Sequence, residues 1–163
     1  MDVELRRAGP DDWQLWRDTR LAALADSPRA FGSTLARERD YDEATWRASL
    51  VPERGLKTVA AGPDGTVLGM AGGWVPPDRG GAAELWGMWV APAHRGRGVA
   101  GALIGEVLDW ARAEAHPRVE LWVVGDNAAA RRLYARLGFR ETGETQAYPP
   151  DPAVAEHLMA HAL

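Results

Sequence analysis

Short segments in which apolar residues alternate with polar ones, or run without interruption, divide the chain into seven candidate β-strands. Turn residues separate them, and Gly62-Pro63-Asp64-Gly65 is a strong hairpin signal. The second, third and fourth segments follow one another through short turns, so we expect an antiparallel meander. The predicted strands are Val3–Arg6, Leu56–Ala61, Val67–Val75, Ala83–Val90, Arg118–Val124, Arg140–Gln146 and Glu156–Leu163.

Helical spacing of apolar residues predicts about four helices between these strands. The third helix links the strands Ala83–Val90 and Arg118–Val124, and such a crossover makes the two strands parallel. The predicted fold is therefore α/β, with a mixed, mostly antiparallel central sheet that contains one parallel βαβ unit. The helices are expected at Asp11–Asp26, at Leu35–Leu50 with a break near Asp40–Asp42, at Val99–Ala115, and from Asn127 to a left-handed cap at Gly138.

The composition is that of an ordinary globular protein, and residues 1–163 are expected to form a single domain. The net charge of −4 argues against a general nucleic-acid binder. The absence of cysteine excludes disulfides, thiolate zinc sites and a cysteine nucleophile. No apolar run approaches the ~18 residues of a membrane span, and Met1–Glu4 lacks the features of a signal peptide. We therefore expect a soluble cytoplasmic protein without metal, nucleic-acid or membrane partners.

A basic, glycine-rich turn follows the strand Ala83–Val90 and leads into the helix Val99–Ala115. Pro92 ends the sheet pairing, because proline has no N–H to donate, and Arg95-Gly96-Arg97-Gly98 follows. A loop that ends at a helix N-terminus offers unpaired backbone N–H groups and a partial positive charge. Glycines allow that backbone to approach a ligand closely. The segment therefore predicts a phosphate-binding loop.

Two familiar kinds of phosphate loop fit this segment poorly. A P-loop needs Gly-Lys followed by Ser or Thr at the helix start, where this chain has Gly98-Val99-Ala100. The stretch Gly96–Gly101 satisfies G-x-G-x-x-G, and Glu120 lies where a dinucleotide fold places its ribose carboxylate. However, the dinucleotide fingerprint follows its strand directly and precedes several βα units, and the chain after Arg118 is too short for them. A nicotinamide-dependent fold therefore stays a weaker alternative.

Two motifs resemble the GNAT superfamily of N-acetyltransferases. The pattern V-x-P-x-x-R-G-x-G-V-A at Val90–Ala100 is similar to the family's acetyl-CoA loop. The pattern N-x-x-A-x-x-L-Y-x-x-x-G-F at Asn127–Phe139 is similar to a later helix of the family. The two together, in this order and at this separation, are more specific than either alone. The resemblance covers Glu84–Arg140 and implies the GNAT-type version of the mixed sheet, with its parallel unit at the acetyl-CoA site.

The resemblance implies that acetyl-CoA is the acyl-donor cosubstrate. Its pyrophosphate would be held mainly by backbone N–H groups of the loop, and its pantetheine arm by the exposed edge of the strand that ends at Val90. Asn127 would either hydrogen-bond to the pantetheine or only cap its helix. The residues expected to bind acetyl-CoA are Met88, Val90, Arg95, Gly96, Arg97, Gly98, Val99, Ala100, Gly101 and Asn127.

Acetyl transfer to an amine requires a base for the amine, polarisation of the thioester carbonyl and an acid for the leaving thiolate. Glu84 is the candidate base, because burial in an apolar strand would raise its pKa from about 4.3 toward neutrality. Its position before Arg95 also resembles that of the catalytic glutamate in some GNAT members. Glu120 or a water chain is the alternative base, and Tyr134 is the candidate acid. A solvent-facing edge glutamate and a buried tyrosine are the structural alternatives.

These residues predict an acetyl-CoA-dependent N-acetyltransferase that acetylates a primary amine of a small molecule or a protein. Direct transfer is expected, since there is no cysteine to form an acyl-enzyme. A non-catalytic acyl-CoA-binding or sensor domain of the same fold is the alternative. The loops Phe31–Thr34 and Tyr148–Pro152 are expected to form part of the acceptor wall, but they do not identify the acceptor. The resemblance also leaves a homodimer open, because dimers are common among such proteins.

Overall fold

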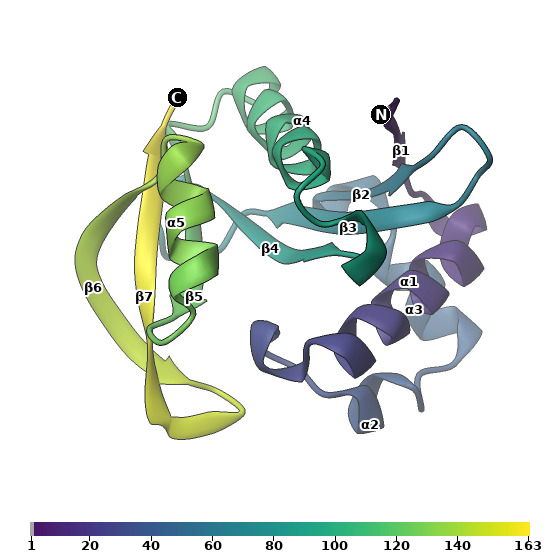
Figure 1. Ribbon diagram of the computed structural model, residues 1–163, viewed down its shortest axis with the longest axis horizontal. Helices are drawn as coiled ribbons and strands as arrows, with labels where there is room; N and C mark the ends of the chain where they lie inside the picture. The colour runs from purple at the N-terminus through teal and green to yellow at the C-terminus, as the bar shows by residue number, and fades with distance from the viewer. Residues whose placement is uncertain (1) are drawn as a thin grey trace.

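One seven-stranded sheet organises the computed structural model, which describes residues 2–163 (Figure 1). Its strands are β1 Glu4–Arg7, β2 Leu56–Ala61, β3 Val67–Trp74, β4 Ala83–Val90, β5 Arg118–Val124, β6 Arg140–Tyr148 and β7 Asp151–Ala162. They lie in the order β1-β2-β3-β4-β5-β7-β6. β4 and β5 run parallel, and the other neighbouring strands pair antiparallel. The predicted meander β2-β3-β4 and the predicted parallel pair are both confirmed.

Helices cover both faces of this sheet (Figure 1). They are α1 Trp13–Asp26, α2 Leu35–Glu38, α3 Glu43–Ser49, α4 Val99–Ala113 and α5 Ala128–Arg136. The break expected within Leu35–Leu50 lies between α2 and α3, where the Asp42 side chain accepts a hydrogen bond from the backbone N–H of Thr45 at 2.8 Å. Gly138 follows α5 with φ of +97°, which is the left-handed conformation expected there. Within residues 2–163, no helix is both long and apolar enough to cross a membrane.

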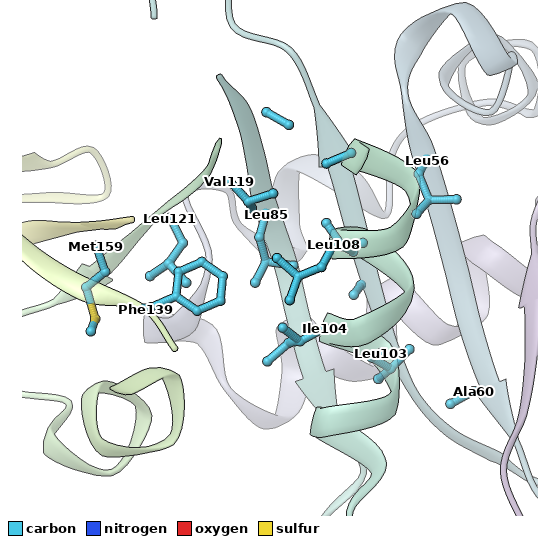
Figure 2. Close-up of a cluster of buried hydrophobic side chains, with 14 of the residues drawn as sticks. Leu56, Ala60, Leu85, Leu103, Ile104, Leu108, Val119, Leu121, Phe139 and Met159 are labelled. Atoms are coloured by element: carbon cyan, nitrogen blue, oxygen red, sulfur yellow. The ribbon is translucent and has the colours of Figure 1, made fainter. Parts of the chain in front are cut away.

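The two faces of the sheet bury separate apolar clusters. On one face, α4 packs side chains such as Ile104 against Leu85 of β4 and its neighbours, as Figure 2 shows. On the other face, α1 contributes Trp16 to a second cluster. Because side chains alternate along a strand, Ala60 of β2 joins the first cluster and its neighbour Val59 joins the second. The sheet is therefore buried on both sides in its centre.

The last two strands extend further into the proline-rich segment than the sequence pattern predicted. β6 reaches Tyr148 and β7 begins at Asp151, and these two residues face each other in the ladder. Pro149-Pro150 therefore forms a short hairpin turn instead of part of a longer loop. β7 also lies between β5 and β6. That position depends on contacts between distant segments, so no local pattern specified it.

β4 and β5 stay paired for only a short distance. They pair at Ala83–Val119 and Glu84–Glu120, and the ladder then stops. The register of β4 against β3 shifts next to Gly87, whose φ is +62°. A bulge of this kind bends its strand and increases the local twist. Beyond Glu84 the two strands diverge, and the edge of β4 that faces β5 has no neighbouring strand within the described residues (Figure 1).

The close packing of β3 on β4 predicts that Gly69 tolerates no side chain. A Cβ there would clash with the backbone carbonyl oxygen of Trp89. Backbone cannot move aside as a flexible side chain can, so we expect Gly69→Ala to lower the free energy of unfolding by ~1–3 kcal/mol. Urea unfolding measures the change.

Gly105 of α4 provides the matched control. A Cβ at this position would meet no atom within 4 Å, so Gly105→Ala should raise the free energy of unfolding by ~0.5–1 kcal/mol through helix propensity. A Gly69→Ala protein as stable as the wild type would contradict the packing of these two strands.

Candidate functional site

A cavity of about 350 Å³ lies where β4 and β5 diverge. Four residues predicted from the sequence line it, although they are far apart in the chain. Glu84 and Met88 come from β4, Asn127 precedes α5, and Tyr134 lies in α5. Both loops expected in the acceptor wall reach the same cavity through Phe31, Gly32, Tyr148 and Pro149. The candidate base, the candidate acid and part of the candidate acetyl-CoA site are thus brought together.

Glu84 lines the cavity from β4 and is half-buried. Its carboxylate accepts a hydrogen bond from the indole N–H of Trp74, its cross-strand neighbour on β3. Burial raises the pKa of Glu84, the Trp74 hydrogen bond offsets part of this rise, and the carboxylates of Glu156 and Glu120 raise the pKa further. A carboxylate with a raised pKa is a stronger base than one in water, which suits removal of a proton from an ammonium group.

Glu120, the alternative base, lies in a different environment although it pairs with Glu84 in the sheet. Its buried carboxylate accepts two hydrogen bonds of 3.0 Å from Arg79, and Arg118 lies 3.4 Å away. Burial would raise the pKa of Glu120, but the contacts with Arg79 and Arg118 outweigh it and hold the pKa below its usual range. Glu120 is not among the residues that line the cavity. This geometry favours a structural ion pair over a base.

Tyr134 and Asn127 face the same cavity from α5 and its N-terminus. The ring of Tyr134 packs edge-on against Phe139, with 5.9 Å between the ring centroids. Desolvation by the surrounding protein raises the pKa of Tyr134 to about 12, so the phenol stays protonated at physiological pH. Asn127 Oδ1 accepts a hydrogen bond from the backbone N–H of Ala130 at 3.1 Å. Asn127 therefore caps α5, and its side chain also borders the cavity.

Two predicted residues of β4, Met88 and Val90, differ in whether they reach the cavity. Met88 lines the cavity beside the bulge at Gly87. Val90 does not line the cavity; it pairs with Gly69 of β3 and packs against the α4 cluster. Met88 and Val90 both pack against the α4 cluster, and of the two only Met88 also borders the cavity.

The glycine-rich loop has the geometry of an anion-binding loop. Gly96 and Gly98 adopt φ of +74° and +83°, a left-handed conformation that favours glycine, and both are exposed. Gly98 caps α4, whose first backbone bond runs from the N–H of Ala102 to the Gly98 carbonyl. Within residues 2–163, the N–H groups of residues 96–101 donate to no protein acceptor. Such unpaired N–H groups at a helix N-terminus attract anions.

The side chains of this loop differ in whether protein contacts already hold them. Arg95 donates to the carboxylate of Asp26 at 2.6 Å and to the carbonyl oxygen of Val90 at 3.0 Å, and so ties the loop to the end of α1. Val99 is buried in the α4 cluster, so only its backbone is available to a ligand. Arg97 is exposed and forms no ion pair with any described residue. Arg97 is therefore the arginine of this loop whose charge is free to meet an anion.

Glu156 lines the cavity but was not among the residues predicted from the sequence. Glu156 lies on β7 beside Val124, is only 8% exposed, and accepts a hydrogen bond of 2.6 Å from Gln146. Burial raises the pKa of Glu156, and the Gln146 contact offsets part of the rise. A local signal existed, because Glu156 shares one face of its strand with the buried Leu158. A polar residue at such a core-facing position is a site candidate.

Two further cavity residues connect its walls. Tyr148 of the β6-β7 hairpin donates its hydroxyl hydrogen to the carbonyl oxygen of Phe31 at 2.6 Å, so it fastens the two predicted acceptor loops together. Arg20 of α1 lies with its guanidinium carbon 4.7 Å from the ring centroid of Phe31 and 5.4 Å from that of Trp86. Tyr148 belongs to a loop that the sequence predicted for the acceptor wall, whereas Arg20 carried no local signal, since it acts through contacts with distant segments.

The raised pKa of Glu84 predicts that Glu84→Gln stabilises the protein at neutral pH. The native state binds the proton more tightly than the unfolded chain, so the stabilisation from this group is complete below an unfolded pKa of about 4.5 and is lost as the pH rises through the native pKa. Glutamine carries no charge and retains a side-chain oxygen for Trp74.

Thermal unfolding followed by circular dichroism tests this expectation. The Glu84→Gln protein should melt at a higher temperature than the wild type near neutral pH, and the difference should disappear at about pH 4. A variant that melts lower at neutral pH would contradict the burial of an ionised Glu84.

Comparison with known proteins agrees with this architecture. A family model described as "Acetyltransferase (GNAT) family" matches residues 16–139. Mycothiol acetyltransferase of Beutenbergia cavernae is 34% identical over 124 residues, which are 76% of this chain and 40% of that protein. The L-amino acid N-acetyltransferase AaaT of Escherichia coli K12 is 29% identical over 153 residues, covering 90% of this chain and 88% of that protein. The chain therefore spans about two fifths of the mycothiol acetyltransferase but most of AaaT.

A solved structure shows the same fold along the entire chain. The PaiA N-acetyltransferase of Thermoplasma acidophilum, in complex with coenzyme A, matches 100% of both chains with a TM-score of 0.76 at 14% identity. The family model covers well over half of the residues and includes the β4 edge, the glycine-rich loop and α5. This chain belongs to the GNAT family of acetyltransferases.

Proposed function

We propose that the protein is an acetyl-CoA-dependent N-acetyltransferase that transfers the acetyl group directly to a primary amine. The observation that carries the proposal is the meeting of Glu84, Met88 and Tyr134 in one cavity beside the unpaired edge of β4. The family match supports acetyl transfer, and the CoA complex of PaiA supports a CoA thioester as donor. The acetyl-CoA preference and the amine acceptor are our inference from these residues.

The unpaired backbone groups of the glycine-rich loop and of the β4 edge suit two parts of acetyl-CoA, its pyrophosphate and its pantetheine arm. The N–H groups of residues 96–101 would bind the pyrophosphate, with Arg97 adding positive charge. The unpaired edge of β4 near Met88 would hydrogen-bond to the amides of the pantetheine arm as a neighbouring strand does. The bound donor supplies an acetyl group activated as a thioester.

The cavity residues have separate tasks in the transfer. Glu84 takes the proton from the acceptor ammonium group, so that the amine nitrogen can form a bond to the acetyl carbon. A backbone N–H beside Met88 stabilises negative charge on the carbonyl oxygen. Tyr134 donates its phenolic hydrogen to the sulfur as the carbon–sulfur bond breaks, the new amide nitrogen loses its second proton to solvent, and solvent restores the phenol. Since desolvation keeps this phenol protonated, the donor is present throughout the physiological pH range.

The anion-binding loop predicts how acetyl-CoA affinity responds to substitution. Gly98→Glu places a side chain at φ of +83° and adds negative charge, so we expect the dissociation constant for acetyl-CoA to rise at least ~10-fold. Arg97→Ala removes only an exposed charge and should raise it by no more than ~5-fold. Isothermal titration calorimetry measures both, with NAD as the control ligand. Binding of NAD in place of acetyl-CoA would contradict the assignment.

The proposed proton transfers predict a loss of turnover without a loss of donor binding. Glu84→Gln and Tyr134→Phe should each lower kcat by ~10²-fold or more and change the acetyl-CoA dissociation constant by less than ~2-fold. In the wild type, kcat/KM should rise with pH through a pKa above the usual glutamate range, and this limb should be lost in Glu84→Gln.

Steady-state assays that detect free CoA thiol over a range of amines provide the measurement. Unchanged kcat in both variants would contradict the catalytic roles proposed for Glu84 and Tyr134. Acetyl-CoA binding without turnover of any amine would instead identify a non-catalytic acyl-CoA-binding domain.

A further inference from the structure

A second cavity, of about 280 Å³, adjoins the first on the side of α1, α2 and α3. Arg20 and Trp86 line both cavities and so form the boundary between them. The remaining lining residues come from α1, from α2 and α3, and from the loops beside them; they are Trp16, Ser33, Arg37, Glu38, Tyr41, Thr45, Trp46 and Ser49. The role proposed above for the first cavity uses none of these residues.

Three residues that line this second cavity each carry a buried polar atom without a hydrogen-bond partner among the described residues. These atoms are Arg20 Nη1, Ser33 Oγ and Trp46 Nε1. Arg20 is 7% exposed and Trp46 is 3% exposed, so bulk water does not surround them. Arginine and tryptophan nitrogens only donate, and a serine hydroxyl can also donate. The wall of the cavity therefore contains a set of donors without matching protein acceptors.

The hydrogen bonds of Arg20 explain why one of its nitrogens remains free. Its Nε and Nη2 each donate to Glu38 at 2.9 Å, which holds the guanidinium plane in place. A Cβ at Gly87 would lie 3.3 Å from Arg20 Nη1, so the free nitrogen lies beside the bulge of β4. It is therefore positioned at the boundary between the cavity that contains Glu84 and the second cavity.

The walls and charges of the second cavity indicate the chemistry of its ligand. Its ionisable lining residues are Arg20 and Arg37 against Glu38, which leaves one net positive charge. The rings of Trp16 and Trp86 meet edge-on at the boundary, with 6.1 Å between their centroids, and Tyr41 packs edge-on against Trp46. Donors combined with positive charge favour a carboxylate, and the aromatic walls favour an apolar body attached to it.

We propose that the second cavity binds the carboxylate of the acceptor, so that the acceptor is an amine that also carries a carboxylate group, such as an amino acid. Arg20, Ser33 and Trp46 donate hydrogen bonds to the carboxylate, while the amine lies in the first cavity near Glu84. This inference rests on the proposed function for turnover, but binding of the carboxylate can be measured without it.

Matched acids and amides test the proposal on the intact protein. Isothermal titration calorimetry would compare phenylalanine with phenylalaninamide, and 4-aminobutyrate with its amide, so that two amine-to-carboxylate separations are sampled. We expect the acid of at least one pair to bind ~10-fold more tightly than its amide. Trp46→Phe keeps the ring and removes the N–H, and Ser33→Ala removes the hydroxyl. Each should weaken binding of that acid at least ~3-fold and leave the amide unchanged.

Ser49→Ala provides the control, because the Ser49 hydroxyl already donates to the carbonyl oxygen of Trp46 at 2.7 Å. It should leave the affinity for the acid unchanged. Acetyl-CoA binding to each variant shows that the donor site remains intact. Equal affinity for acid and amide in both pairs, or no effect of both Trp46→Phe and Ser33→Ala, would show that the cavity holds only solvent and would overturn the proposal. Selective binding of the acid without turnover would support the carboxylate site but would contradict the proposed acetyl transfer.

Discussion

The parallel ladder between β4 and β5 ends at Glu84 and Glu120. The cavity exists because the two strands separate there. The bulge at Gly87 bends β4, while α4 and its apolar cluster hold both strands from one face. The protein thereby leaves one edge of a central strand unpaired, which a fold normally avoids. A ligand with amide groups can replace the missing strand, and the cavity beside that edge contains the side chains for which we propose catalytic roles.

Glutamates in this part of the sheet have pKa values shifted in opposite directions because their partners differ. Arg79 lowers the pKa of Glu120 in a partly buried pair, and this pair stabilises the start of β5. Glu84 and Glu156 lack an arginine partner among the described residues, and burial raises the pKa of each. Proximity in the sheet therefore does not determine the direction of the pKa shift. The presence of an arginine partner that is distant in the sequence determines it.

Local signals in the sequence were sufficient for most of the fold. β2, β4 and β5 have the predicted bounds, because glycine and proline turns delimit their apolar runs. The glycine-rich loop and Tyr134 were identified from motifs whose residues are close in the chain. Glu156 was missed because its strand was taken to begin there, although it shares a face with buried residues.

Local signals did not predict that β7 lies between β5 and β6. They also did not predict that Arg20 lies between two cavities. Both depend on packing between segments that are far apart in the sequence. The same limit applies to the acceptor, since the second cavity is formed by three helices that show no shared pattern.

The central claim is that an acyl-CoA thioester lies along the open edge of β4 with its pyrophosphate on the glycine-rich loop. Hydrogen–deuterium exchange with and without acetyl-CoA tests this most directly, because it reports on the backbone N–H groups themselves. We expect slower exchange on binding at residues 87–90 and 96–101, with α3 unchanged. Protection elsewhere, with these two segments unaffected, would contradict this mode of binding.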